Sequence, residues 1–490
     1  MRTRFAPSPT GFLHIGGFRT ALFAYLHAKK NGGKFLLRIE DTDRERFVEG
    51  GMDNILNSLY WAGIIPDEGV MVEDGKVMQK GKNGPYIQSE RLKIYHEYIA
   101  RLLEEGKAYH CFCSKERLDK LRETQEKNKL PTGYDGYCLN LTSEEIKKKE
   151  AAGEKSVIRL KVPKNEQIVI EDMVRGTVKF DTNLIDDQVL LKSDGFPTYH
   201  FAVVIDDHLM EITDIIRGEE WLPSTPKHVI LYNYFGWKIP NYAHLSLLVN
   251  EKKQKLSKRH GDVSVFDFKE KGYLPESLLN FVALLGWNPG DEREIFSLKE
   301  LEKEFDIKKV GKSASVFDIN KLDWMTGQYI KKMSDATLAE LILPFLNNSG
   351  LCNGISADNS LLMPLAKMCK ERMSKLSDIV ELSGFIFADF LDYDSDLLIW
   401  KKSDLKTTKD NLESLLEFLN EVEIKYWNEK WLQEKIQTWI ESNGRTVGEI
   451  LWPMRVALSG QKNSPGPFEI ASVLGKEKTI ERIRYAISAL

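Results

Sequence analysis

The segment at residues 2–17, RTRFAPSPTGFLHIGG, constrains the fold of this chain more than any other stretch. Its first five residues predict a short strand, and the prolines and glycine that follow force a turn before His14. From Gly16 onward apolar residues recur at helical spacing as far as Asn31, and a second apolar run at residues 35–39 follows at once. Strand, turn, helix and strand in this order predict a βαβ unit, and therefore a parallel sheet.

The first turn of that helix is a candidate anion site. Its backbone N–H groups lack helical partners, the helix dipole is positive at this end, and Gly16 and Gly17 let a phosphate approach the backbone. His14 adds a donor beside them. The spacing matches neither the P-loop nor the dinucleotide fingerprint, so an ordinary turn with glycines for tight packing remains an alternative at this point.

Length, composition and charge predict a globular protein of several domains. A chain of 490 residues with 42% hydrophobic residues can form roughly three or four domain-sized units. We expect neither a signal peptide nor a membrane span, because the N-terminus has prolines in place of an apolar run and no stretch is long enough; the expected compartment is the cytoplasm. With a net charge of −4, any nucleic-acid partner must be held by local basic patches.

A second motif accompanies the first. The sequence HIGG at residues 14–17 and the sequence KLSKR at residues 255–259 look like the two signatures of class I aminoacyl-tRNA synthetases, and among these the chain resembles the glutamyl-tRNA synthetases of bacterial type. Further matches in family order make unrelated turns an untenable alternative. These matches lie at residues 5–11, 38–43, 195–200, 206–208, 217–221 and 455–460.

The resemblance implies an ATP-dependent glutamate–tRNA ligase. Such an enzyme joins L-glutamate to tRNA(Glu) through a glutamyl-adenylate and releases AMP and diphosphate, with ATP bound as its Mg²⁺ complex. This chemistry needs positioning and charge neutralisation rather than a covalent enzyme nucleophile, and a mobile basic loop can supply charge as it develops on the diphosphate. The residues that the resemblance assigns to ATP and catalysis are His14, Gly16, Gly17, Glu220, Leu248, Lys255 and Lys258.

Selection of glutamate over glutamine requires a fixed guanidinium that pairs with a carboxylate. The resemblance assigns this contact to Arg4, and the carboxylate of Glu40 would suit the substrate ammonium. Where some family members carry Asn, this chain has Val203, so a polar contact there is missing or replaced. The implied pocket consists of Arg4, Ser8, Glu40, Tyr199 and Arg217.

The resemblance also implies the domain organisation. We expect a multi-domain α/β plus all-α protein: a Rossmann-type parallel sheet, split by an inserted α+β domain and followed by a helical anticodon-binding region. Alternating apolar residues predict antiparallel strands in the insert, and amphipathic helices replace strand patterns after about residue 331. The expected units are residues 1–108 with 200–250 (the catalytic sheet), 109–199 (the insert, which binds the tRNA acceptor end), 251–330 (a stem-contact domain with the KLSKR loop), and 331–385 and 386–490 (two helical anticodon-binding domains).

The helical region favours a glutamyl enzyme, since bacterial glutaminyl-tRNA synthetases carry β-barrel anticodon domains. Two other functions remain open at this stage: a truncated paralogue that transfers glutamate to a modified tRNA base, and a non-catalytic tRNA-binding paralogue. Also open is whether tRNA(Gln) is a partner beside tRNA(Glu), and we expect a monomer. The residues implied in anticodon reading are Arg372, Arg455, Ser464 and Pro465.

The cysteines suggest a structural zinc site. Five cysteines, an odd number, argue against a disulfide framework. Cys111, Cys113 and Cys138 match the zinc pattern of some relatives, but Asn140 stands where a His is expected. Tyr134 resembles the phenolate ligand of the truncated paralogue, and three thiolates with one oxygen would complete a tetrahedral site. The alternative is three reduced cysteines that only pack.

Overall fold

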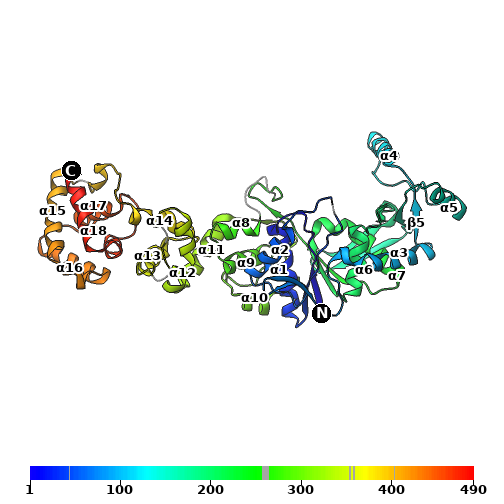
Figure 1. Cartoon of the computed structure of the whole chain (residues 1–490), viewed down its shortest axis with the longest axis horizontal. Helices are drawn as coiled ribbons and strands as arrows, with labels where there is room; N and C mark the ends of the chain where they lie inside the picture. Colours follow the sequence, from blue (N-terminus) through cyan, green and yellow to red (C-terminus); the bar gives the residue numbers. More distant parts are fainter. Residues whose placement is uncertain (44, 257–263, 352–354, 357–358, 402) are drawn as a thin grey trace. The chain divides into compact units, whose positions relative to one another are not determined.

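The computed structural model describes residues 1–43, 45–256, 264–351, 355–356, 359–401 and 403–490 (Figure 1). These residues form two units. The first unit comprises Met1–Lys269 with Leu278–Ile319, and the second comprises Glu270–Ser277 with Asn320–Leu490.

An eight-stranded sheet forms the centre of the first unit, with the strand order β4-β3-β2-β1-β10-β11-β7-β8. Neighbours from β3 to β7 pair in parallel, whereas β4 and β8 pair antiparallel at the two edges. The expected parallel sheet is therefore confirmed. Its strands are β1 (Arg2–Phe5), β2 (Lys34–Leu37), β3 (Glu68–Glu73), β4 (Lys76–Lys80), β7 (Gln167–Asp172), β8 (Gly176–Asp181), β10 (Asp214–Gly218) and β11 (Asn241–Leu245).

The βαβ unit predicted at the N-terminus is present. The helix α1 (Ile15–Lys30) joins β1 to β2, which pair in parallel, and it packs on β1, β2 and β10. It is buried along most of its length, and it ends at Asn31, whose backbone N–H donates to Ala28 O at 3.2 Å. The other helices of the sheet region are α2 (Gly51–Trp61), α3 (Leu92–Glu104), α6 (Tyr199–Leu209) and α7 (Thr225–Phe235).

The insert is smaller than the sequence suggested. Its strands β5 (Ala108–Cys111), β6 (Val157–Leu160) and β9 (Val189–Leu191) form a separate antiparallel sheet, with helices α4 (Lys115–Lys127) and α5 (Ser143–Ala151). The hairpin β7–β8 also lies within residues 109–199, but it extends the central sheet through Asp172, which pairs with Tyr242 on β11. Alternating burial along β7 looks the same in either sheet, so periodicity could not assign this strand.

The rest of the first unit follows the central sheet. The short strands β12 (Leu248–Val249) and β13 (Ser315–Val316) pair in parallel. The α-helices described between them in the chain are α8 (Val265–Glu270), α9 (Pro275–Leu284) and α10 (Leu298–Glu304), and residues 270–277 of this stretch belong to the second unit.

The second unit is helical throughout its described residues, as expected. One apolar core runs from Leu338 to Ala486, so the regions 331–385 and 386–490 share a single core. Residues 320–330, which we expected in the preceding domain, belong to this unit because Ile330 contributes to the same core. None of the described helices is long and apolar enough to cross a membrane. The helices are α11 (Ile319–Lys332), α12 (Asp335–Asn348), α13 (Leu362–Cys369), α14 (Asp378–Phe387), α15 (Leu405–Glu421), α16 (Glu429–Ser442), α17 (Val447–Ser459) and α18 (Pro467–Ala489).

Candidate active site

His14 caps the N-terminus of α1. Its Nδ1 accepts a hydrogen bond from the backbone N–H of Gly16 at 3.0 Å, so the neutral ring carries its proton on Nε2. A Cβ on Gly16 would lie 3.4 Å from His14 Nδ1, and one on Gly17 would lie 3.3 Å from Leu13 Cδ1. The two glycines therefore leave room for this cap. With no acidic residue in the first turn of α1, the positive end of the helix and an Nε2–H donor favour an anion.

The segment around β12 is held from several sides. Leu248 is buried, and its carbonyl accepts from Leu256 N at 3.1 Å, so the chain folds back on β12 and leaves Lys255 exposed. Lys258, the lysine expected to neutralise the diphosphate, lies outside the described residues.

Glu220, which the sequence assigned to ATP, is exposed. Its neighbour Glu219 has a structural role that the sequence did not suggest: its Oε1 accepts from Leu247 N at 2.8 Å, and its Oε2 pairs with Arg175. Glu219 thus fixes the backbone immediately before Leu248. The only sequence signal was the doubled glutamate that follows Gly218.

Arginines and carboxylates form a buried network at the carboxyl ends of β1 and β2. Asp207 Oδ1 accepts from Arg4 Nε at 3.0 Å and from Arg38 Nη1 at 2.8 Å. Arg38 Nη2 also donates to Glu40 Oε1 at 2.9 Å. Burial works against the charge of Arg38, but the surrounding carboxylates raise its pKa well above the usual value. Burial raises the pKa of Glu40, and Arg38 opposes that shift.

Arg217, on β10, differs from these arginines. It is only 5% exposed, yet it forms no ion pair with a carboxylate of the described residues. All its hydrogen-bond partners are neutral acceptors. They are His244 Nε2 at 3.0 Å from Nε, His228 Nδ1 at 3.2 Å and Tyr199 OH at 3.5 Å from Nη1, and Thr225 Oγ1 at 2.8 Å and Trp221 O at 3.4 Å from Nη2.

Three histidines surround this guanidinium in uncharged form. His228 Nε2 lies 3.1 Å from His200 Nδ1, and His244 faces Arg217 from β11. Burial is the main cause that lowers the pKa of all three, to about 4 for His200, and the positive charge of Arg217 lowers each further. A buried guanidinium with neutral neighbours suits an anionic ligand.

The structure brings together four of the five residues predicted to bind glutamate. Tyr199 touches Arg217, burial raises the pKa of Tyr199, and the charges of Arg217, Glu40 and Arg4 all act on its phenol. Ser8 is exposed on the loop after β1. The backbone N–H of Glu40 donates a hydrogen bond to Pro7 O in the same loop at 3.0 Å. Sequence reasoning assigned no role to Asp207, Arg38, His228 or His244, although the first two lie in matched segments.

Val203 is buried to 1% exposure within α6. It lies one helical turn after Tyr199, which begins the same helix.

The cysteines converge as predicted. The Sγ atoms of Cys111, Cys113 and Cys138 all lie within 4.8 Å of one another, with 3.6 Å between Cys113 and Cys138. Tyr134 OH lies 3.4 Å from Cys111 Sγ and 3.6 Å from Cys113 Sγ. Two thiolates at about 2.3 Å from one tetrahedral zinc would be roughly 3.7 Å apart, so this donor set fits the metal.

The four residues predicted to read the anticodon separate into two pairs. Arg372 is exposed, and Arg455 lies on α17 with its guanidinium 4.7 Å from the centre of the Trp452 ring. Burial lowers the pKa of Arg455, and the charge of Arg372 adds to this shift. By contrast, Ser464 and Pro465 are buried in the loop before α18.

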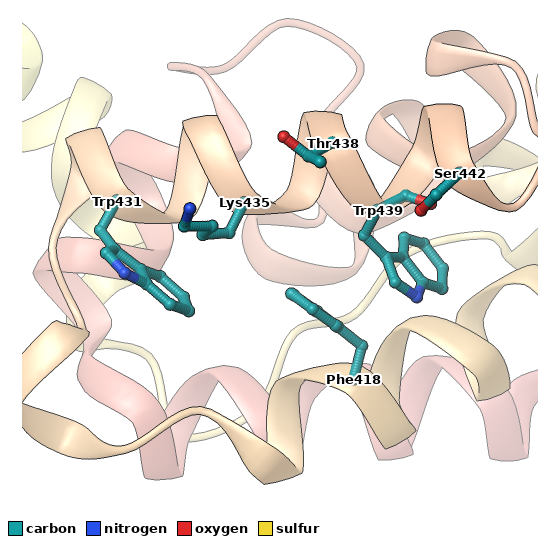
Figure 2. A pocket seen from close by; sticks show the side chains of 6 residues that line it. All are labelled: Phe418, Trp431, Lys435, Thr438, Trp439 and Ser442. Carbon is teal, nitrogen blue, oxygen red and sulfur yellow. The ribbon is translucent and has the colours of Figure 1, made fainter.

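A hollow of about 310 Å³ lies elsewhere in the second unit, between α15 and α16 (Figure 2). None of the predicted site residues lines it. Trp431 and Trp439 flank Phe418 there, with Lys435 on the same helix as the tryptophans.

Helix α1, capped by His14, and the buried arginines lie at the carboxyl ends of parallel strands, the edge at which open α/β sheets hold their ligands, and the chain is an enzyme of the class I aminoacyl-tRNA synthetase type. Residues 1–324 match the family described as tRNA synthetases class I (E and Q), catalytic domain, and residues 337–487 match the anticodon binding domain. The chain belongs to the glutamyl-tRNA synthetase family.

Its relatives cover the whole chain. Glutamate–tRNA ligase from Alkaliphilus metalliredigens is 49% identical over 99% of this chain and 98% of its own length, and that from Clostridioides difficile is 47% identical with the same coverage. The crystal structure of a glutamate–tRNA ligase from Elizabethkingia meningosepticum, in complex with its amino acid, superposes with a TM-score of 0.87 at 38% identity. It covers 100% of this chain and 99% of that one.

Proposed function

We propose that this chain joins L-glutamate to tRNA(Glu) at the expense of ATP, through a glutamyl-adenylate, with release of AMP and diphosphate. Arg217 is the observation that carries the proposal for the amino-acid site: a buried guanidinium with no carboxylate partner among the described residues. It lies at the carboxyl end of β10, beside the strand that carries Arg4. A substrate carboxylate would supply the negative charge that this guanidinium lacks, in place of its long contacts to Tyr199 OH at 3.5 Å and Trp221 O at 3.4 Å, and Glu40 would accept the substrate ammonium.

Activation then depends on positioning and charge. The Nε2–H of His14 and the N-terminus of α1 hold the triphosphate, while the backbone at Leu248 meets the adenine. Lys255 and Lys258 act on the diphosphate as it leaves, and Mg²⁺ would neutralise phosphate charge when bound. Because the lysines act mainly on charge that develops in the transition state, they raise the rate more than the affinity.

The cysteine site is proposed to hold a structural Zn²⁺ through Cys111, Cys113, Tyr134 and Cys138. The support is the convergence of three thiols and one phenol at distances that suit a tetrahedral ion. Because β5 carries Cys111 and pairs with β6, the metal would tie the Cys138 loop to the sheet of the insert.

The second unit is proposed to read the tRNA anticodon, with Arg372 and Arg455 as its cationic contacts and Ser464 and Pro465 shaping the loop beside them. The match of residues 337–487 to an anticodon binding domain argues against the truncated paralogue, which normally lacks one. We further propose a cytoplasmic monomer that acts on tRNA(Glu), with tRNA(Gln) as a second candidate substrate.

Charging of purified tRNA(Glu) and tRNA(Gln) with labelled glutamate tests these proposals. Charging of tRNA(Glu) with ATP–diphosphate exchange supports the ligase, and the tRNA(Gln) arm decides the second substrate. A chain that binds tRNA(Glu) but shows neither exchange nor charging would be a non-catalytic paralogue. The oligomeric state follows from light scattering on the same sample.

A further inference from the structure

We propose that Asp172 and His244 are positioning residues that set the side chain of Arg217 for glutamate. The inference rests on the proposed function, since it takes Arg217 as the residue that contacts the substrate carboxylate. Asp172 is the last residue of β7, and His244 lies on the neighbouring strand β11. Neither residue is among those that the sequence assigned to the site.

Arg217 requires an acceptor at His244 Nε2. The guanidinium Nε carries a single hydrogen and can only donate, and it lies 3.0 Å from His244 Nε2. Thr225 Oγ1, which accepts from Arg217 Nη2, lies 3.2 Å from the same nitrogen. His244 must therefore keep a lone pair on Nε2 and its proton on Nδ1.

Asp172 selects that tautomer. Its Oδ2 lies 2.6 Å from His244 Nδ1 and 3.2 Å from the backbone N of His244, so a proton on Nδ1 is held between the ring and the carboxylate. All these groups are fully or almost fully buried, so water cannot substitute for the missing partner of a wrong tautomer.

The orientation of Asp172 is itself fixed. Its Oδ1 accepts from Val174 N at 2.9 Å, from Arg175 N at 2.8 Å and from His244 N at 3.3 Å. Arg175 also donates from Nε to the carbonyl of His244 at 3.2 Å. The turn between β7 and β8 thus holds His244 by its ring, its N–H and its carbonyl, and fixes the ring that faces Arg217.

Asp172→Asn is the decisive variant. Oδ1 is committed to backbone N–H donors, so the amide NH₂ must take the place of Oδ2 and point at His244 Nδ1. The imidazole then has to accept on Nδ1 and carry its proton on Nε2, where it opposes the N–H of Arg217. We expect the KM for glutamate in ATP–diphosphate exchange to rise by about tenfold to a hundredfold, from a buried donor left unsatisfied, while the KM for ATP changes little.

Glu171→Gln is the matched control. Glu171 precedes Asp172 on the same strand, is exposed, and bonds only to Thr177 Oγ1 at 2.9 Å among the described residues. We expect wild-type KM values for this variant. Thermal unfolding of both variants shows whether the hairpin still folds.

A double-mutant cycle separates positioning from packing. His244→Gln offers an amide oxygen near the Nε2 position and has no tautomers, so adding Asp172→Asn in that background should raise the KM for glutamate by less than threefold. An equal rise in both backgrounds would overturn the inference, as would an unchanged KM for Asp172→Asn alone.

Arg217→Gln distinguishes failure of the inference from failure of the proposed site. If Arg217→Gln leaves the KM for glutamate unchanged, the proposed glutamate site is wrong. If that variant loses glutamate while correctly folded Asp172→Asn does not, the site stands and the positioning role is wrong. Imidazole ¹⁵N shifts of histidine-labelled protein, with His244→Gln to assign the signal, give a direct second readout: the Nδ1–H tautomer in the wild type and its loss in Asp172→Asn.

Discussion

Arg217→Gln should mainly weaken glutamate binding and Arg38→Gln should mainly lower stability, although both variants remove a buried guanidinium. Arg217 pairs with no described carboxylate, so its loss orphans no buried charge. Removal of one partner of a buried charged pair costs about 2–5 kcal/mol. If that pair forms with glutamate, the KM for glutamate should rise roughly thirty-fold to several thousand-fold, since 1.4 kcal/mol is about a factor of ten.

Arg38 behaves differently because it is fully buried and contacts both Asp207 and Glu40, at 2.8 and 2.9 Å. Arg38→Gln leaves two buried carboxylates with fewer partners, so the free energy of unfolding should fall by about 3–5 kcal/mol. Kinetics of ATP–diphosphate exchange and denaturant unfolding of the two variants, side by side, make the comparison. The reasoning is refuted if Arg217→Gln destabilises the protein more than Arg38→Gln does, or retains the wild-type KM for glutamate.

Three more outcomes are expected. Burial lowers the pKa of His200 to about 4, so between about pH 6.5 and pH 4 the unfolded state binds a proton that the folded state does not. The free energy of unfolding should therefore fall as the pH drops through this range, by at most about 3 kcal/mol for this half-buried ring. Denaturant unfolding of His200→Gln should show a flatter pH dependence. Lys258→Ala should lower the activation rate by about a hundredfold to ten-thousandfold with glutamate affinity nearly intact, and pre-steady-state adenylate formation measures this. Cys138→Ser should empty the zinc site, whereas Tyr134→Phe should only weaken zinc binding. Elemental analysis of the variants and the wild type, all purified without chelator, measures this. A wild-type zinc content far below one per chain, with full charging activity, would assign these side chains to packing.

Local features of the fold were predictable because local chemistry produces them. The βαβ unit follows from helical periodicity between two short apolar runs, whereas the cap that His14 Nδ1 forms on the N–H of Gly16 was not predicted. Cys111 and Cys138 lie 27 positions apart in the chain, and the resemblance to the zinc pattern of some relatives brought them into one predicted site.

Contacts across the sheet were not predictable in this way. The bond between Asp172 and His244 joins residues 72 positions apart, and it exists because β7 adds to the edge of the central sheet. An alternating strand pattern is compatible with either sheet, so the sequence placed β7 in the insert. The lack of a carboxylate partner for Arg217 among the described residues is a property of three-dimensional packing, whereas the sequence shows only 69 Lys and Arg beside 73 Asp and Glu, with no sign of which pair.

The balance of buried charge gives the site a reason to prefer glutamate over glutamine. Arg4 donates to Asp207, Arg38 to both Asp207 and Glu40, and Arg91 to Asp206, so three arginines match three carboxylates. The positive charge of Arg217, by contrast, has no carboxylate partner among the described residues. Glutamate carries one net negative charge and would neutralise it, whereas glutamine carries none and would leave a buried cation uncompensated. Since the histidines around Arg217 are neutral acceptors, they cannot supply that charge. Selection therefore depends on the charge of the ligand as well as its shape, and Arg217→Gln should reduce the preference for glutamate over glutamine together with the affinity.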